Sequence, residues 1–156
     1  MLPQGTKGET APVHPLASTP GPTLANAVTA VRLTLHVLAA TIWVGGQFTL
    51  AGLLPTVRRL GEDAPKRIAR AFGRIQWPAY AVLLVTGVWN VLAVHVKDAT
   101  GAWKAVLLVK IVVVLIAGLS AYIHQNAKTK AGLAAFGALT AFASVAALVL
   151  GIVLAG

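Results

Sequence analysis

The stretch Trp103–His124, WKAVLLVKIVVVLIAGLSAYIH, determines the fold class of this chain. Its length is near the ~20 residues that an α-helix needs to cross about 30 Å of hydrocarbon at ~1.5 Å per residue. Three similar apolar stretches lie at about 31–54, 77–96 and 132–155. Only a helix satisfies its backbone polar groups within one spanning segment. The sequence therefore predicts an all-α polytopic membrane protein, a four-transmembrane-helix bundle over residues 28–156.

The composition also indicates a surface that faces lipid. Hydrophobic residues make up 57% and charged residues 11% of the chain, with a mean hydropathy of +0.78. Soluble domains are closer to half apolar and a quarter charged. The net charge of +9 does not indicate a nucleic-acid partner, because the basic residues flank apolar spans instead of covering a polar domain. The expected partner is the lipid bilayer, and the expected location is the cell (cytoplasmic) membrane.

The distribution of basic residues predicts the orientation. Residues 1–27 are rich in Pro, Gly, Thr and Ala, which predicts a disordered extracytoplasmic tail. The first and third connections hold most of the cations: Arg58, Arg59, Lys66, Arg67, Arg70, Arg74, Lys128 and Lys130. By the positive-inside rule these two connections are cytoplasmic. Both the N-terminus and the C-terminus are then expected outside.

A short basic amphipathic helix is predicted within the first connection. Its apolar residues fall at i, i+4 and i+7, namely Ile68, Phe72 and Ile75. Three basic residues lie between them, Arg67, Arg70 and Arg74. Such a helix lies at the inner headgroups, where the three arginines either bind anionic lipid or only anchor the topology.

Four ionisable side chains lie in or at the ends of the spans, and each is costly in lipid. In the predicted orientation His36, His95 and Lys110 come from three helices and share the outer leaflet, with Lys110 roughly 10 Å below the surface. His124 lies alone on the cytoplasmic side. The other interpretation is that Lys110 extends its ammonium to the interface and that His95 and His124 are ordinary interfacial residues.

Helical spacing predicts which of these residues face neighbouring helices. In the first span three polar or aromatic residues recur at i, i+7 and i+11: His36, Trp43 and Gln47. In the third span four residues repeat every seven positions: Trp103, Lys110, Ala117 and His124. A stripe of polar and small residues marks a helix face turned toward other helices. We therefore expect His36 and Lys110 inside the bundle, with Thr86 and Asn90 of the second span as interhelical hydrogen-bonding residues.

Small residues predict close helix contacts at two places. Gly45 and Gly46 lower the helix propensity of the first span, which is consistent with a close approach of another helix. In the fourth span Ala143, Ala147 and Gly151 form a small-xxx-small strip. This strip either packs within the bundle or pairs with a second copy in a homo-oligomer.

Three segments together resemble the copper-resistance D (CopD) membrane family: HVLAATIWVGG at 36–46, LLVTGVW at 83–89 and WKAVLLVK at 103–110. The resemblance covers roughly residues 30–125. It implies a polytopic inner-membrane protein that moves copper or supports copper tolerance, with His36 and His95 as candidate ligands. The chain departs from a full-length member in having only four spans and no cysteine, and Met1 is its only methionine. Cu(I) favours sulfur ligands.

The same features also resemble the HemJ-type protoporphyrinogen oxidase, a four-helix membrane protein with a first-span histidine and a third-span lysine. This resemblance implies haem b as the cofactor, with His36 as the axial ligand. Lys110 would pair with a propionate or handle a proton. Imidazole is a good axial ligand, and bundle interiors suit cofactors held between facing helices.

A third hypothesis is a cofactor-free accessory protein, in which His36 and Lys110 only bond neighbouring helices. No acidic residue lies inside a span, and neither a paired-carboxylate nor a phosphate-loop motif occurs in the chain. The residues themselves therefore do not predict an enzyme.

Overall fold

The computed structural model describes residues 24–156, and its long elements are all helices. In chain order they are α1 (Ala27–Ala40), the π-helical η1 (Thr41–Gly45), α2 (Gly46–Arg59), α3 (Ala64–Leu92), the 3₁₀-helical η2 (Val96–Asp98), α4 (Gly101–Asn126) and α5 (Lys130–Ala155). The first three form one continuous rod, Ala27–Arg59. The structure thus has four helical rods that are long and apolar enough to cross a membrane, which confirms the all-α part of the predicted fold class and the number of long apolar helices among the described residues.

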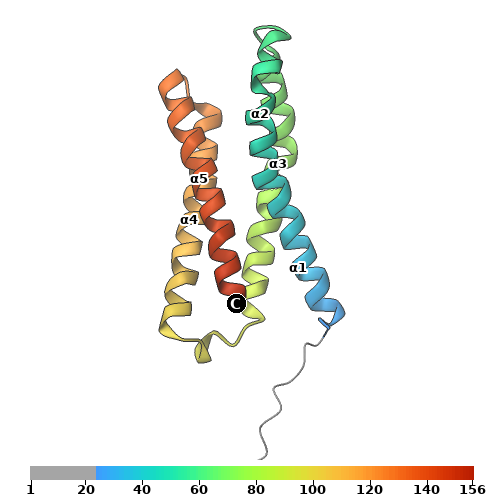
Figure 1. Cartoon of the computed structure of the whole chain (residues 1–156), viewed down its shortest axis with the longest axis vertical. Helices are drawn as coiled ribbons and strands as arrows, with labels where there is room; N and C mark the ends of the chain where they lie inside the picture. Colours follow the sequence, from blue (N-terminus) through green and yellow to red (C-terminus); the bar gives the residue numbers. More distant parts are fainter. Residues whose placement is uncertain (1–23) are drawn as a thin grey trace, which may run out of the picture.

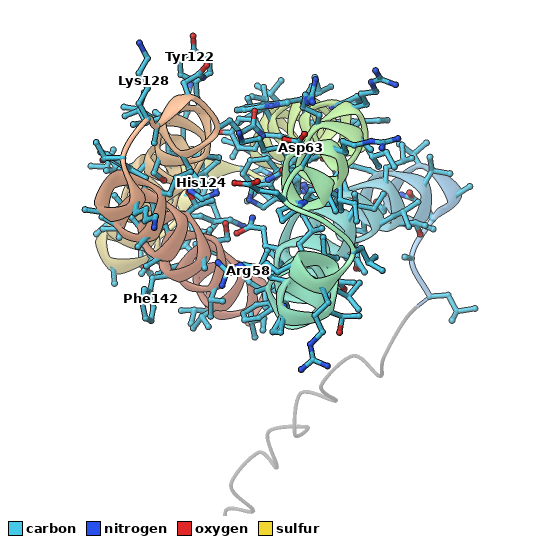
Figure 2. All side chains as sticks on the ribbon, turned by 90° about the horizontal axis from the view of Figure 1, so that it is seen from above. Arg58, Asp63, Tyr122, His124, Lys128 and Phe142 are labelled. Carbon is cyan, nitrogen blue, oxygen red and sulfur yellow. The ribbon has the colours of Figure 1, made fainter. Side chains whose placement is uncertain are left out.

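The rods form two antiparallel hairpins (Figure 1). One hairpin pairs the α1–η1–α2 rod with α3, and the other pairs α4 with α5. Seen along the bundle, the two hairpins lie beside each other (Figure 2). We call the end with the start of α1 and the end of α5 the terminal end. The opposite end, with the α2–α3 and α4–α5 turns, is called the basic end because Arg58, Arg59, Lys128 and Lys130 lie there.

Side-chain caps fix the starts of three helices. Asn26, Thr100 and Thr129 have extended backbone conformations and accept a hydrogen bond from the N–H three residues later. Such caps satisfy one of the free N–H groups of a helix start. They explain why the helices begin at Ala27, Gly101 and Lys130, slightly before the predicted starts at 31, 103 and 132. Residues 1–23 of the predicted tail lie outside the described residues.

The predicted separate amphipathic helix is wrong. Residues 64–76 are the first part of α3, which continues without a break to Leu92. Pro65 is compatible with a helix start, and Pro78 removes only one backbone hydrogen bond inside a long apolar helix. The Phe72 ring packs against Gly46 of α2 instead of facing lipid. Three arginines on this part of α3 are exposed, Arg67, Arg70 and Arg74, and their contact with lipid headgroups stays a prediction.

The end of the second span also differs from the prediction. The helix ends at Leu92 and not near residue 96, so His95 lies in the connection beyond it. Its φ of −74° and ψ of 73° are not helical, and its side chain is exposed. His95 therefore does not close a span. It precedes the short η2 turn that leads to α4.

Small and hydroxylated residues form the buried contact between α4 and α5. Ala117, Ser120 and Ala121 of α4 are buried against α5, and the Thr140 hydroxyl donates to Ser120 Oγ at 3.0 Å. Large apolar side chains lie on the outside, where Phe142 is 74% exposed (Figure 2). This arrangement suits a bundle in lipid, where small residues allow close packing and the apolar surface faces acyl chains.

The strip of Ala143, Ala147 and Gly151 faces the chain's own helices. Ala143 is 6% exposed, and Gly151 faces the Lys110 side chain of α4. The structure therefore uses this strip within the protomer. A homo-oligomer through it stays a prediction without support from this arrangement.

Two neighbouring glycines give a matched test of the α2–α3 contact. A Cβ at Gly46 would overlap the Phe72 ring, whereas a Cβ at Gly45 would meet nothing within 4 Å. We expect Gly46→Ala to lower the free energy of unfolding by about 1–3 kcal/mol through overpacking. Gly45→Ala should leave it unchanged or raise it by up to about 1 kcal/mol through helix propensity. Unfolding in mixed micelles measures both, and equal effects would contradict the packing described.

Candidate functional site

The first element of the site is a hydrogen bond between α1 and α3. His36 of α1 is half-buried, and its Nδ1 lies 2.7 Å from Oγ1 of Thr86, which is buried on α3. The Thr86 hydroxyl also lies 2.6 Å from the Val82 carbonyl oxygen, to which it donates its single proton. Thr86 Oγ1 must then accept the proton of His36 Nδ1. In the neutral imidazole this leaves Nε2 with a free lone pair.

Gly87, the residue after Thr86, leaves space for the imidazole ring of His36. A Cβ at Gly87 would lie 3.8 Å from Cε1 of His36, so the ring rests over this turn of α3. The threonine holds one side of the ring while the glycine leaves space along its edge. The predicted interhelical hydrogen bond is therefore confirmed for Thr86. It is not found for Asn90, whose buried Oδ1 has no partner.

Lys110 of α4 is half-buried and directed toward α5. A Cβ at Gly151 would lie 2.9 Å from its Nζ, which shows that the glycine leaves space for the ammonium group. The lysine side chain thus lies against α5, with its ammonium beside a glycine that is nearer the terminal end than Lys110 itself. The interpretation in which Lys110 extends its ammonium to the interface stays open.

The helix register places these groups at a similar depth. Tyr80 of α3 donates to the Val114 carbonyl oxygen of α4 at 3.0 Å, which ties the two hairpins together at that level. From there toward the terminal end, Thr86 is about 9 Å farther along α3 and Lys110 about 6 Å farther along α4. Thr86, its partner His36 and Lys110 therefore lie within about one helical turn of one another in depth.

One turn nearer the terminal end are two buried polar atoms without a partner. Among the described residues, Nε of Arg32 and Oδ1 of Asn90 are buried and form no hydrogen bond. Arg32 precedes His36 by four residues on α1, and Asn90 follows Thr86 by four on the antiparallel α3. The two therefore share a level and a helix face with the His36–Thr86 pair. An unsatisfied buried polar group is costly, especially in lipid.

We call Arg32, His36, Thr86, Asn90 and Lys110 the polar cluster. The sequence interpretation overlooked Arg32, although its position one turn before His36 was a signal that could have identified it. The acidic residues of the described chain are all in connections: Glu62, Asp63 and Asp98. No acidic side chain lies within a long helix of residues 24–156. The polar cluster is therefore cationic, with hydrogen-bonding groups but without a carboxylate in its helices.

Trp43 and Gln47 lie toward the middle of the bundle and join the two hairpins. The buried Trp43 donates from Nε1 to Ser144 Oγ of α5 at 2.9 Å, and Gln47 donates to the same oxygen at 3.3 Å. The Trp43 ring also packs against Tyr80, with 4.5 Å between ring centroids, and against Trp77 at 6.0 Å. These residues lie nearer the basic end than the polar cluster does, and they are not part of it.

Neither of the other two histidines among residues 24–156 belongs to the polar cluster. His95 is exposed in the α3–α4 connection. His124 is at the basic end, where its Nδ1 lies 2.8 Å from the Leu133 carbonyl oxygen and its ring covers Gly137 (Figure 2). The latter is a contact between α4 and α5. Among residues 24–156, no three His, Cys, Asp or Glu side chains come together as a metal site would require.

Comparison of the chain with protein families, with curated proteins and with solved structures found no match. The interpretation of the polar cluster therefore depends on its own geometry. That geometry is one imidazole with a free Nε2, two cations and two unsatisfied polar atoms in a bundle that can span a membrane.

Proposed function

We propose that this chain is a multi-pass membrane protein that binds haem b in the half of the bundle near the terminal end. His36 Nε2 is the proposed axial ligand. The observation that carries this proposal is the hydrogen bond from His36 Nδ1 to Thr86, whose own proton is donated to Val82. A second group that binds one imidazole nitrogen orients the ring and fixes which nitrogen is free to bind a metal.

The donor set fits haem better than a copper ion. Haem iron needs one or two axial ligands, and the propionates of the macrocycle are anionic. His36 supplies one nitrogen, Arg32 supplies positive charge one helical turn away on α1, and Lys110 supplies a second positive charge at a similar depth on α4. When bound, haem supplies one-electron chemistry, while the chain orients the axial imidazole and excludes water with its apolar helices. A copper ion would find one imidazole nitrogen, with no sulfur ligand nearby and His95 exposed elsewhere.

CopD-like metal handling is the second candidate function. In its favour, two of the three segments that carry the CopD resemblance are in contact, because His36 of the first lies 2.7 Å from Thr86 of the second. The third segment ends at Lys110, which faces α5. This candidate requires further ligands from another chain or molecule.

We infer that the terminal end is extracytoplasmic and that the chain resides in the cell (cytoplasmic) membrane. The support is the charge distribution: exposed basic residues are concentrated at the basic end, on α2, α3 and the α4–α5 turn. Short loops rich in Lys and Arg stay in the cytoplasm. The polar cluster then lies in the outer half of the membrane.

An absorption spectrum tests the haem proposal. Purified in detergent, the protein should show a Soret band that shifts on reduction with dithionite. His36→Ala should abolish it, while His124→Ala should retain it, because His124 lies at the basic end against α5, away from the polar cluster. Metal analysis of the same samples completes the test. Bound copper without a Soret band would favour the second candidate, and a folded protein with neither would indicate a cofactor-free accessory protein.

Cysteine labelling tests the orientation, since the chain has no cysteine of its own. Asp98→Cys lies in the connection at the terminal end and Lys128→Cys in the turn at the basic end. In intact cells an impermeant maleimide should label the first and leave the second unlabelled until the membrane is broken. The reverse pattern would place the polar cluster in the cytoplasmic half.

A further inference from the structure

We propose that the basic end holds one anionic phospholipid of the adjacent leaflet in a groove between α2 and α3. The phosphate lies against the arginine row of α3, which we define as Arg67, Arg70 and Arg74. Part of one acyl chain lies in the groove. This inference goes beyond the proposed function and does not rest on it, because the groove and the polar cluster are in opposite halves of the bundle.

The first step in the argument is that the tip of the α2–α3 hairpin extends past the second hairpin (Figure 1). Trp77 of α3 donates from Nε1 to Oε1 of Gln125 at 3.0 Å, and a Cβ at Gly73 would lie 3.7 Å from Nε2 of the same glutamine. Gln125 is one residue from the end of α4. Arg67 lies six residues, about 9 Å, farther toward the tip. The start of α3 therefore continues beyond the end of α4, where its exposed side chains can face lipid headgroups.

The second step is an open groove along this part of the hairpin. It has a volume of about 470 Å³ and a mostly apolar lining: Leu60, Ala64, Arg67, Ile68 and Ala71. Leu60 is 73% exposed, and Leu53, seven residues earlier on the same face of α2, is 51% exposed. Sites for small ligands have volumes of roughly 300–1,000 Å³. The groove therefore has room for part of one lipid, and its lining suits an acyl chain.

The third step is the positive charge beside the groove. Arg67 lines the groove, and the side chains of all three members of the arginine row are exposed. Near this row the described chain has two acidic residues in the α2–α3 turn, Glu62 and Asp63, so the surface keeps an excess of positive charge. The planar fork of a guanidinium matches the oxygens of a phosphate. The charge beside the groove thus favours an anionic lipid over a zwitterionic one.

The fourth step is the continuity of the groove with the apolar surface of α3. Ala71, Pro78 and Val85 recur every seven residues on one face of this helix, and all three are exposed. This face runs from the middle of the bundle, where it would face acyl chains, to the groove at the basic end. A lipid beside α3 can therefore place its chains on this face and its phosphate at the arginine row. An acidic protein segment would match the cations but not the apolar face.

Binding of dioleoyl phosphatidylglycerol to the full-length protein in detergent tests the proposal. Dioleoyl phosphatidylcholine is the comparison lipid, because it has the same chains and no net charge. Native mass spectrometry counts the bound lipids and measures their affinities. We expect one phosphatidylglycerol site that is at least about tenfold tighter than phosphatidylcholine. Equal affinities would overturn the proposal. So would equally tight binding of glycerophosphoglycerol, the headgroup without chains.

Charge variants separate the arginine row from the general charge of the basic end. Gln at all three positions of the row should lower the affinity for phosphatidylglycerol at least about tenfold and leave phosphatidylcholine unchanged. The matched control removes the same charge from exposed positions that do not line the groove: Arg59→Gln, Lys128→Gln and Lys130→Gln. Equal losses in the two combinations would overturn the site. If the first combination fails to fold, Arg67→Gln alone should cost about fivefold.

A groove variant tests the place of the acyl chain while keeping every charge. Ala71→Trp fills the groove and should weaken both lipids at least about fivefold, which corresponds to about 1 kcal/mol of lost apolar burial. Ala69→Trp is the matched control, because Ala69 is exposed on the same helix and does not line the groove. Equal effects of the two tryptophans would contradict the groove. The Soret band is a separate readout, because all these variants leave the polar cluster intact.

Discussion

The hydrogen bond between His36 and Thr86 is the interaction on which the site depends. Inside a bilayer a polar side chain has no water to bond with, so each one must find a partner or lie where a ligand supplies it. Thr86 can serve His36 only as an acceptor, because its proton is donated to its own helix at Val82. This one constraint orients the imidazole, joins α1 to α3 and leaves Nε2 unpaired.

The rest of the bundle holds that pair in place through contacts between the hairpins. Trp43 and Gln47 of the first hairpin both donate to Ser144 of the second, and Tyr80 donates to the α4 backbone at Val114. Gly118 allows this approach, because the Tyr80 ring occupies the space that a Cβ would need. Polar contacts of this kind contribute roughly 0.6 kcal/mol each in membrane proteins. Their main effect is to set the register that brings Lys110 to the depth of His36.

The sequence was sufficient to predict the four helical rods, because their length and hydropathy leave no other spanning structure. The seven-residue spacing correctly predicted that Lys110 faces a neighbouring helix, which is α5. The sequence pattern did not predict that His95 lies beyond the helix, because the end of α3 depends on the backbone turn into η2. The separate amphipathic helix was wrong because an amphipathic pattern also fits the continuous start of α3, where Phe72 packs on Gly46. Arg32 was missed because an arginine near a helix start resembles an interfacial residue, although it lies one turn before His36 and its Nε is buried.

Nitrogen-15 NMR of the histidine side chains tests the central claim most directly. In the ligand-free protein, with the His36 signal assigned through its loss in His36→Gln, the account predicts a neutral imidazole with its proton on Nδ1 and none on Nε2. Thr86→Val should change that signal, since it removes the acceptor. A proton on Nε2 with a bare Nδ1, or a fully protonated ring at neutral pH, would contradict the account. The nitrogen meant to bind a metal would then not be free.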